Sequence, residues 1–351
     1  MKSIRPGLFG ITKTNRDFSL KGAWGKNQFN SSFPASLCCY LASKKHDANY
    51  LSIFNKTFSQ KTIAIKDVFG IEYNDEDTYF AFESQHTPYQ KFVVGSLPRT
   101  DLVIQRVSSG NCLAGLEIKL TALPDETTFD LAEDEYGSEI VVRPDTIVYL
   151  ACSIAMKFGD NLGEVLPDIN VADWTEPADV LVKIKQIVLA IENISLMLEP
   201  DQSAFLIQPI WKTMGKSPEL ADNCLDVFIW SEAGFCNFIT QLADGNTSAK
   251  SINRPTRTIV WLYKMLKDIK DSGKFNPKII IDSMSYNTKN DKAFASSGAI
   301  TQKFMTCPRL LKPIIEKSEI KNLILGGGQN LLSPERRFDA ILFGSPELFN
   351  K

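Results

Sequence analysis

Three charged residues lie close together in the segment from residue 98 to residue 119. Asp101 ends the stretch "PRTD", and Glu117 and Lys119 are two residues apart in "GLEIKL". Carboxylate oxygens are hard ligands that suit Mg²⁺, which typically takes one or two carboxylates and leaves room for water and phosphate. If Asp101 and Glu117 meet in the fold, the sequence predicts a site for a divalent cation, with Lys119 supplying part of the positive charge.

A β-hairpin would bring the two carboxylates together. The stretch "SSGN" is a turn signal between two β-rich runs, and a hairpin that is symmetrical about residue 109 pairs residues whose numbers add up to 218. Asp101 then lies opposite Glu117 on one face, and Leu102 lies opposite Leu116 on the apolar face. Directly opposed carboxylates are unfavourable in a sheet unless a cation lies between them. A slip of one residue in the turn would move Asp101 to the other face.

The same residues have a plainer interpretation. Leu116, Ile118 and Leu120 alternate with Glu117 and Lys119, and this period of two is typical of an ordinary half-solvated strand. In that case the charged side chains would only face water. The residue types alone leave both interpretations open.

The elements around the hairpin alternate between helix and strand patterns. Predicted helices cover residues 144–159, 177–198 and 254–273, and a short helix follows Ser32, with Pro34 in its first turn. Predicted strands cover residues 278–284, 320–328 and 338–345, and residues 78–84 are expected to form a strand or a short helical piece. This order predicts an α/β fold. We expect a catalytic core over residues 1–160 and a helical and α/β portion over residues 161–351, or one continuous domain.

Charge is distributed unevenly along the chain. Residues 1–45 hold eight Lys and Arg against one Asp, a net charge of +7; residues 46–248 hold 13 against 31 acidic residues, a net charge of −18; residues 249–337 hold 17 against seven, a net charge of +10. Two basic ends could together form a surface for a polyanion such as DNA. Basic helices are also often plain solvated faces, so charge alone does not decide the partner.

Cysteine, histidine and apolar runs exclude several classes of protein. The seven cysteines include no C-x-x-C pair, and the chain has only two histidines, which argues against a disulfide framework and a zinc site. We find neither a signal peptide nor an apolar run that is long enough to cross a bilayer. The sequence therefore predicts a cytoplasmic protein with reduced thiols and no membrane partner.

Asp at the end of one strand followed by Glu-x-Lys on the next is the pattern of the PD-(D/E)xK nucleases, with Thr100 at the position where proline would precede Asp101. Several further blocks carry more weight. "FGITKTNRDFSLKGAWGKNQFNSSFPASL", "YFAFES", "PRTDLV", "GLEIKLTALPD" and "EIVVRPDTIVYLA" occur within about the first 150 residues. Together they resemble the HindVP family of type II restriction endonucleases.

The resemblance implies Mg²⁺-dependent cleavage of double-stranded DNA, with Mn²⁺ as a substitute, by a restriction-endonuclease-like mixed sheet flanked by helices and extended at the C-terminus. It implies a cytoplasmic homodimer in a restriction-modification system, whose methyltransferase forms no stable complex with it. Named members of the family recognise GRCGYC. Asp101 and Glu117 would be the metal ligands, and Lys119 would orient or activate the attacking water. Glu83, in "YFAFES", is a candidate for a further ligand or a strand-end carboxylate.

Base recognition is expected from the basic C-terminal third, because Arg and Lys pair with guanine edges and Asn and Gln with adenine. The candidates for DNA contacts are Arg254, Arg257, Asn287, Lys289, Asn290, Lys292, Arg336 and Arg337, the last two towards phosphates. Each could instead be an ordinary surface residue.

Two other functions fit the same sequence. One is a structure-specific repair or junction nuclease of the same fold, whose cleavage would follow DNA shape. The other is a non-enzymatic DNA-binding protein, whose binding would not depend on Mg²⁺.

Overall fold

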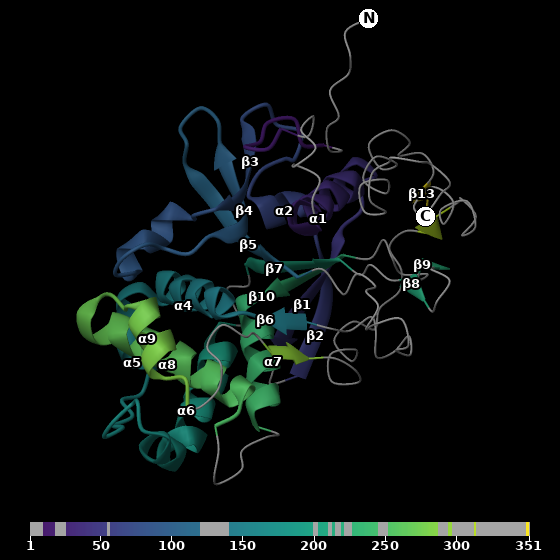
Figure 1. The fold of residues 1–351 in the computed structure, drawn as a ribbon. Helices are drawn as coiled ribbons and strands as arrows, with labels where there is room; N and C mark the ends of the chain where they lie inside the picture. Colours follow the sequence, from purple (N-terminus) through teal and green to yellow (C-terminus); the bar gives the residue numbers. More distant parts are fainter. Residues whose placement is uncertain are drawn as a thin grey trace, which may run out of the picture.

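The computed structural model describes residues 10–17, 26–54, 57–119, 140–198, 203–209, 213–214, 219–220, 227–244, 252–286, 294–296, 312–313 and 349–350. Within them a seven-stranded mixed sheet is flanked by helices on both faces (Figure 1). In order across the sheet, the strands are β2 (Thr57–Ile63), β1 (Ala48–Phe54), β10 (Val227–Ser231), β7 (Ala204–Pro209), β5 (Cys112–Ile118), β4 (Thr100–Arg106) and β3 (Thr78–Ser84). The α/β fold predicted from the order of elements is confirmed, and so is the mixed central sheet that the family resemblance implies.

The sheet combines local hairpins with pairings between distant segments. β1 pairs antiparallel with β2, and β4 pairs antiparallel with both β3 and β5. β7 and β10 come from beyond residue 200 and lie between the two local groups, with β5 parallel to β7 and β1 parallel to β10. Both halves of the chain therefore contribute strands to one sheet, and β5 is an interior strand with a partner on each side.

Two groups of helices cover the two faces of the sheet. On one face are α1 (Lys26–Ser43) and α2 (Ile65–Phe69), and on the other are α4 (Pro144–Phe158), α6 (Pro177–Met197), α7 (Glu232–Asp244) and α8 (Arg254–Ser272). The sequence of β10 shows why each face has its own core. Val227 and Ile229 pack in the core with α1, whereas Phe228 and Trp230 pack in the core with α4 and α8, as alternation along a strand requires.

The shorter elements complete the described fold. They are η2 (Thr87–Phe92), η3 (Gly159–Asn161), α5 (Leu162–Val165), α9 (Pro277–Ser283) and the paired strands β6 (Ile140–Val142) with β11 (Phe294–Ser296), β8 (Thr213–Met214) with β9 (Glu219–Leu220), and β12 (Lys312–Pro313) with β13 (Phe349–Asn350). Among the described residues, no helix is both long and apolar enough to span a bilayer. The five cysteines described are free thiols.

The three long helices that the sequence predicts are confirmed as α4, α6 and α8. Helix α8 ends at Ser272 and is capped by Gly273, whose φ of 78° is left-handed and suits glycine. The residues 320–328 and 338–345, predicted as strands, lie outside the described residues.

Two predicted elements are wrong. Residues 278–283 lie in helix α9 instead of a strand, because Asn276 accepts a hydrogen bond from the Ile279 backbone N–H at 3.1 Å and Pro277 opens the helix. The isoleucine run does not mark a buried strand, since Ile279 is 62% exposed. The helix expected to start after Ser32 starts at Lys26, so Pro34 lies inside it.

Candidate active site

The hairpin of β4 and β5 has the register that the sequence predicts. Leu102 pairs with Leu116 and Ile104 with Ala114, so the partner numbers add up to 218, until a bulge after Ile104 shifts the pairing. Asp101 and Glu117 are the next positions after the Leu102–Leu116 pair. The Asp101 carboxylate accepts a hydrogen bond from the Ile118 backbone N–H at 2.8 Å, which ties it to the strand that carries Glu117.

Glu117 and Lys119 form a buried ion pair at the end of β5. Lys119 Nζ lies 3.1 Å from Glu117 Oε2, and Lys119 is 8% exposed and Glu117 5% exposed. The Lys119 backbone N–H donates to Ile207 O of β7 at 2.9 Å, so β7 fixes the end of the strand. The interpretation of these charges as a water-facing edge of a half-solvated strand is therefore wrong for Glu117 and Lys119.

Two threonine hydroxyls hold the Glu117 carboxylate, one at each oxygen. Thr146 Oγ1, in the first turn of α4, donates to Oε2 at 3.1 Å. Thr100 Oγ1 lies 2.9 Å from Oε1 and 3.0 Å from Leu116 O, and it can donate its single proton to one of them at a time. Thr100 occupies the position where the PD-(D/E)xK pattern has proline, so this departure from the pattern supplies a hydroxyl to Glu117.

Helix α4 also holds the segment that leads into β4. The Tyr149 hydroxyl donates to Pro98 O at 2.9 Å and accepts from the His86 backbone N–H at 3.1 Å. Gly115, on β5, makes room for His86, because a Cβ there would come within 2.8 Å of its ring. The helix therefore fixes both the approach to Asp101 and, through Thr146, the carboxylate of Glu117.

The site holds more negative charge than its buried groups easily tolerate. Burial, followed by the charge of Glu117, raises the pKa of Asp101 to about 6, against the partial compensation of Lys119 and the hydrogen bond from Ile118. Burial and Glu117 also raise the pKa of Asp145, the residue before Thr146 on α4. A cation stabilises two adjoining carboxylates that resist ionisation together, and Mg²⁺ typically takes one or two carboxylates from a protein. The donor set therefore fits Mg²⁺, although the described residues contain no cluster of three or more potential ligands that could hold a metal.

Glu83 faces Asp101 across β3 and β4. The neighbouring pairs Phe82–Leu102 and Ser84–Thr100 fix this register. Glu83 has a left-handed φ of 47°, which is uncommon outside glycine, and its carboxylate forms an ion pair with Arg16 at 2.9 Å. Its role as a further metal ligand stays a prediction, because in this arrangement Arg16 holds the carboxylate.

The predicted DNA-binding residues fall into two groups. Arg254 lies at the first position of α8 and is half-buried. Arg257 is 1% exposed, lies 4.3 Å from the Trp261 ring centroid, and has its pKa lowered to about 10, first by burial and then by Arg254, a placement that favours a packing role. The other candidates lie outside the described residues: Asn287, Lys289, Asn290, Lys292, Arg336 and Arg337.

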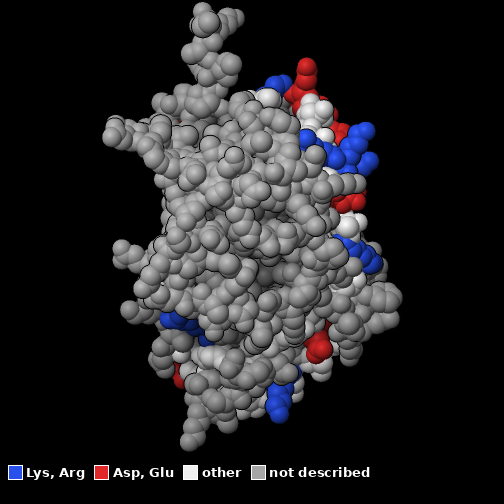
Figure 2. Space-filling view, turned by 90° about the vertical axis from the view of Figure 1, so that its right-hand side faces the viewer, with Lys and Arg blue, Asp and Glu red and all other residues white. Residues whose placement is uncertain are grey.

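On the face drawn in Figure 2, the described Lys and Arg side chains lie among Asp and Glu rather than in a patch of one sign.

Sequence reasoning missed the residues that support the site from other elements. Thr146 lies 29 residues after Glu117, and Asp145 and Tyr149 lie beside it on a helix whose pattern indicates only burial. Arg16 comes from the N-terminal segment, 67 residues before Glu83. A polar residue at the start of an otherwise apolar helix was the one signal that could have pointed to Thr146 and Asp145.

Known proteins are similar to this chain over almost its whole length. The family described as HindVP restriction endonuclease matches residues 24–349. The probable type II restriction enzyme HindVP of Haemophilus influenzae is 53% identical over 350 residues, 99% of this chain and 96% of that protein. The type II restriction enzyme HgiDI of Herpetosiphon aurantiacus is 42% identical over 352 residues, 99% of this chain and 98% of that protein. No solved structure is significantly similar to the chain. The chain belongs to the HindVP restriction endonuclease family.

Proposed function

We propose that this protein is a type II restriction endonuclease that hydrolyses phosphodiester bonds of double-stranded DNA with Mg²⁺, or Mn²⁺ as a substitute. The observation that carries the proposal is the buried Glu117–Lys119 pair next to Asp101, at the end of two paired strands in a chain of this family. A buried lysine paired with a buried carboxylate is a costly arrangement for stability alone. It has a direct use in the hydrolysis of a phosphodiester.

Each residue has a distinct role in the proposed reaction. Asp101 and Glu117 would hold Mg²⁺, which lowers the pKa of bound water and offsets phosphate charge when it is present. Lys119, on the same face as Glu117, would hold a water beside the scissile phosphate. Thr100 and Thr146 keep the Glu117 oxygens oriented, and the cover of α4 limits access of bulk water to the buried side of Glu117. Positioning of this kind is a main source of catalysis in phosphate chemistry.

The remaining parts of the proposal follow from family membership and from charge. We propose GRCGYC as the target sequence to test first, read by the basic C-terminal third through residues such as Arg254. A palindromic target cut on both strands needs two catalytic hairpins related by a two-fold axis, so the working unit would be a homodimer. Such an enzyme would act in the cytoplasm, with a methyltransferase that protects the same sequence and forms no stable complex with it.

The test is a digest of a large DNA of known sequence, with either Mg²⁺ or EDTA. Discrete fragments that map to GRCGYC, and no cleavage in EDTA, are the expected result. Fragments that map to another sequence would retain the endonuclease and replace the target. A smear that follows DNA shape would support a structure-specific nuclease instead, and binding without cleavage in any metal would support a non-enzymatic DNA-binding protein.

A further inference from the structure

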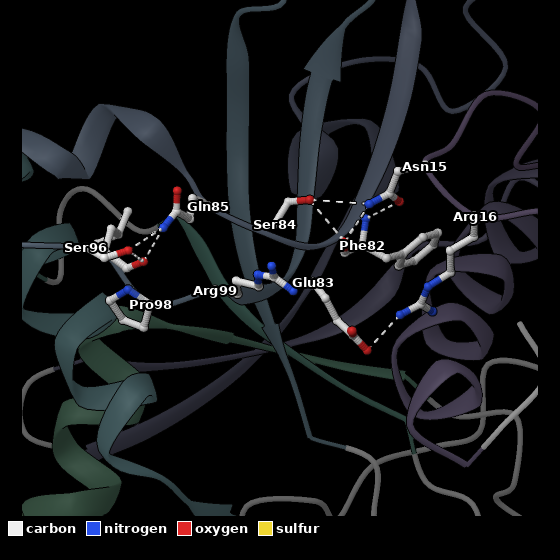
Figure 3. A pocket seen from close by; sticks show the side chains of 10 residues that line it. Asn15, Arg16, Phe82, Glu83, Ser84, Gln85, Ser96, Pro98 and Arg99 are labelled. Carbon is white, nitrogen blue, oxygen red and sulfur yellow. Dashed lines mark hydrogen bonds and ion pairs between the residues drawn. The ribbon is translucent and has the colours of Figure 1, made fainter. Parts of the chain in front are cut away.

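A polar pocket lies beside the candidate active site, where β3 ends and β4 begins (Figure 3). Its volume is about 660 Å³, and all of its lining residues except Phe82, Leu97 and Pro98 are polar or charged. Pockets for small organic ligands are mostly lined by apolar and aromatic side chains. This lining suits a charged, hydrated ligand instead.

The N-terminal segment forms one wall of the pocket by pairing with the edge of β3. The Asn15 side chain donates to Phe82 O at 2.8 Å and accepts from the Phe82 N–H at 2.9 Å, as a neighbouring strand would. Arg16 follows, with its guanidinium 4.5 Å from the Phe82 ring centroid and 2.9 Å from Glu83 Oε1. These contacts fix a guanidinium at the rim of the pocket, with its charge balanced by Glu83.

The opposite wall is the connection that leads into β4. The Gln85 amide donates to Ser96 Oγ at 3.2 Å and also to Leu97 O, which holds this connection against the end of β3. Figure 3 places Arg99 between this group and the Glu83–Arg16 pair. Arg99 is exposed and has no hydrogen bond or ion pair within the described part of the chain. Since Arg16 and Glu83 offset each other, Arg99 carries the uncompensated positive charge of the pocket.

The position of Arg99 relative to the active site indicates which anion the pocket would receive. Arg99 is two residues before Asp101, so the Cα atoms of the two residues are at most about 7 Å apart. Successive phosphates of one DNA strand advance by about 3.4 Å along the helix axis. A strand whose scissile phosphate lies at Asp101 and Glu117, and which runs towards Arg99, would bring a neighbouring phosphate within reach of the Arg99 side chain.

We propose that this pocket binds a backbone phosphate of the cleaved DNA strand, within a few nucleotides of the scissile phosphate, with Arg99 as its main cation. The proposal rests on the proposed function, because it takes the position of the scissile phosphate from the Asp101–Glu117 site. The contact is to the backbone, so it places the strand without reading its sequence.

The first test measures DNA affinity against salt concentration in EDTA, with a duplex that contains the sequence that the protein cuts or, if it cuts none, a GRCGYC duplex. Arg99→Gln should bind about tenfold more weakly at low salt, as expected for loss of one charged hydrogen bond. The slope of log affinity against log salt should be shallower by about 0.9, the value for one phosphate contact. Arg99→Lys keeps the charge and should keep the slope. Lys185→Gln is the matched control, because Lys185 is exposed on α6, at the opposite end of the molecule from β3 in Figure 1.

The second test locates the phosphate. Each duplex in a series carries one neutral methylphosphonate, placed at successive positions near the cleaved bond. The wild type should bind more weakly to the duplex whose methylphosphonate replaces the phosphate that Arg99 contacts. Arg99→Gln should show no such loss of affinity for that duplex. An unchanged salt slope in a folded Arg99→Gln protein would overturn the pocket even if the protein cleaves DNA. A reduced slope in a protein that cleaves no DNA would retain the pocket and overturn the proposed function. Absence of DNA binding by the wild type would overturn both.

Discussion

Replacing Asp101 with asparagine should stabilise the metal-free protein at neutral pH while abolishing Mg²⁺-dependent cleavage. The pKa of Asp101 is raised to about 6 in the folded protein. Against an ordinary value near 3.9, this is a shift of about two units, which corresponds to roughly 3 kcal/mol of unfolding free energy. The asparagine oxygen can still accept the hydrogen bond that Ile118 N–H donates at 2.8 Å, so the substitution removes the charge and little else.

The pH dependence gives the sign of this effect. Because the folded protein binds the proton of Asp101 more tightly than the unfolded chain, the contribution of Asp101 to stability is largest below about pH 4 and is lost as the pH rises through about 6. The stability difference between Asp101→Asn and wild type should therefore be small near pH 4. It should grow to roughly 2–3 kcal/mol by pH 7.5.

Urea unfolding in EDTA at several pH values measures this difference. Asp160→Asn is the matched control, because it makes the same substitution at an exposed position in η3. Addition of Mg²⁺ should stabilise the wild type and have little effect on Asp101→Asn, since an amide is a poorer ligand for a hard cation. An Asp101→Asn protein that is less stable than wild type at pH 7.5, or a difference that does not change with pH, would refute this reasoning.

Three further predictions concern other parts of the molecule. Thr146→Val should lower the cleavage rate about tenfold without weakening DNA binding, and Thr146→Ser should restore the rate, because both changes act on the one hydrogen bond from Thr146 to Glu117. A Thr146→Val enzyme as fast as wild type would contradict this, as would an equal loss in the control Thr240→Val, whose hydroxyl donates to Asn237 O instead. Arg254→Ala should cost about 1–3 kcal/mol in target binding and relax sequence specificity. Arg257→Met should lower the free energy of unfolding and leave specificity intact, because Arg257 is buried; the opposite pattern would make Arg257 the DNA contact and Arg254 the packing residue. Sedimentation of the protein on a duplex with one target site should give two chains per duplex, and one chain per cleaved duplex would exclude the homodimer.

The local parts of the fold and of the site were predictable because their signals are short in sequence. A turn signal between two alternating runs is enough to set the register of β4 and β5, and thus to place Asp101 next to Glu117. The long helices are similarly marked by their period and their caps. The end of α8 before Gly273 is an example in which one residue decides the boundary.

The contacts between segments that are far apart in the sequence could not be predicted, because the residues of one strand do not specify which distant strand it pairs with. The parallel pairing of β5 with β7 joins Glu117 to Leu206 across 89 residues, and it converts an apparently amphipathic strand into a buried interior one. The hydroxyl of Thr146 reaches Glu117 only because α4 packs on that strand. Helix α9 shows the converse, since an apolar run predicted a strand and the Asn-Pro cap signal before it decided the outcome.

The catalytic centre is proposed to lie at the open end of the β4–β5 hairpin, away from its turn, where Asp101, Glu117 and Lys119 come together. Cleavage by variants of Lys119 tests this proposal most directly. Lys119→Ala and Lys119→Gln would be compared with wild type in Mg²⁺ digests, with thermal melts and metal-free DNA binding as checks of folding. Lys119→Gln keeps a donor for Glu117, whose buried carboxylate is paired with Lys119 at 3.1 Å, and should therefore fold even if Lys119→Ala is less stable. We expect folded variants that bind DNA and do not cleave it. Full cleavage by a folded Lys119→Gln or Lys119→Ala protein would contradict the account.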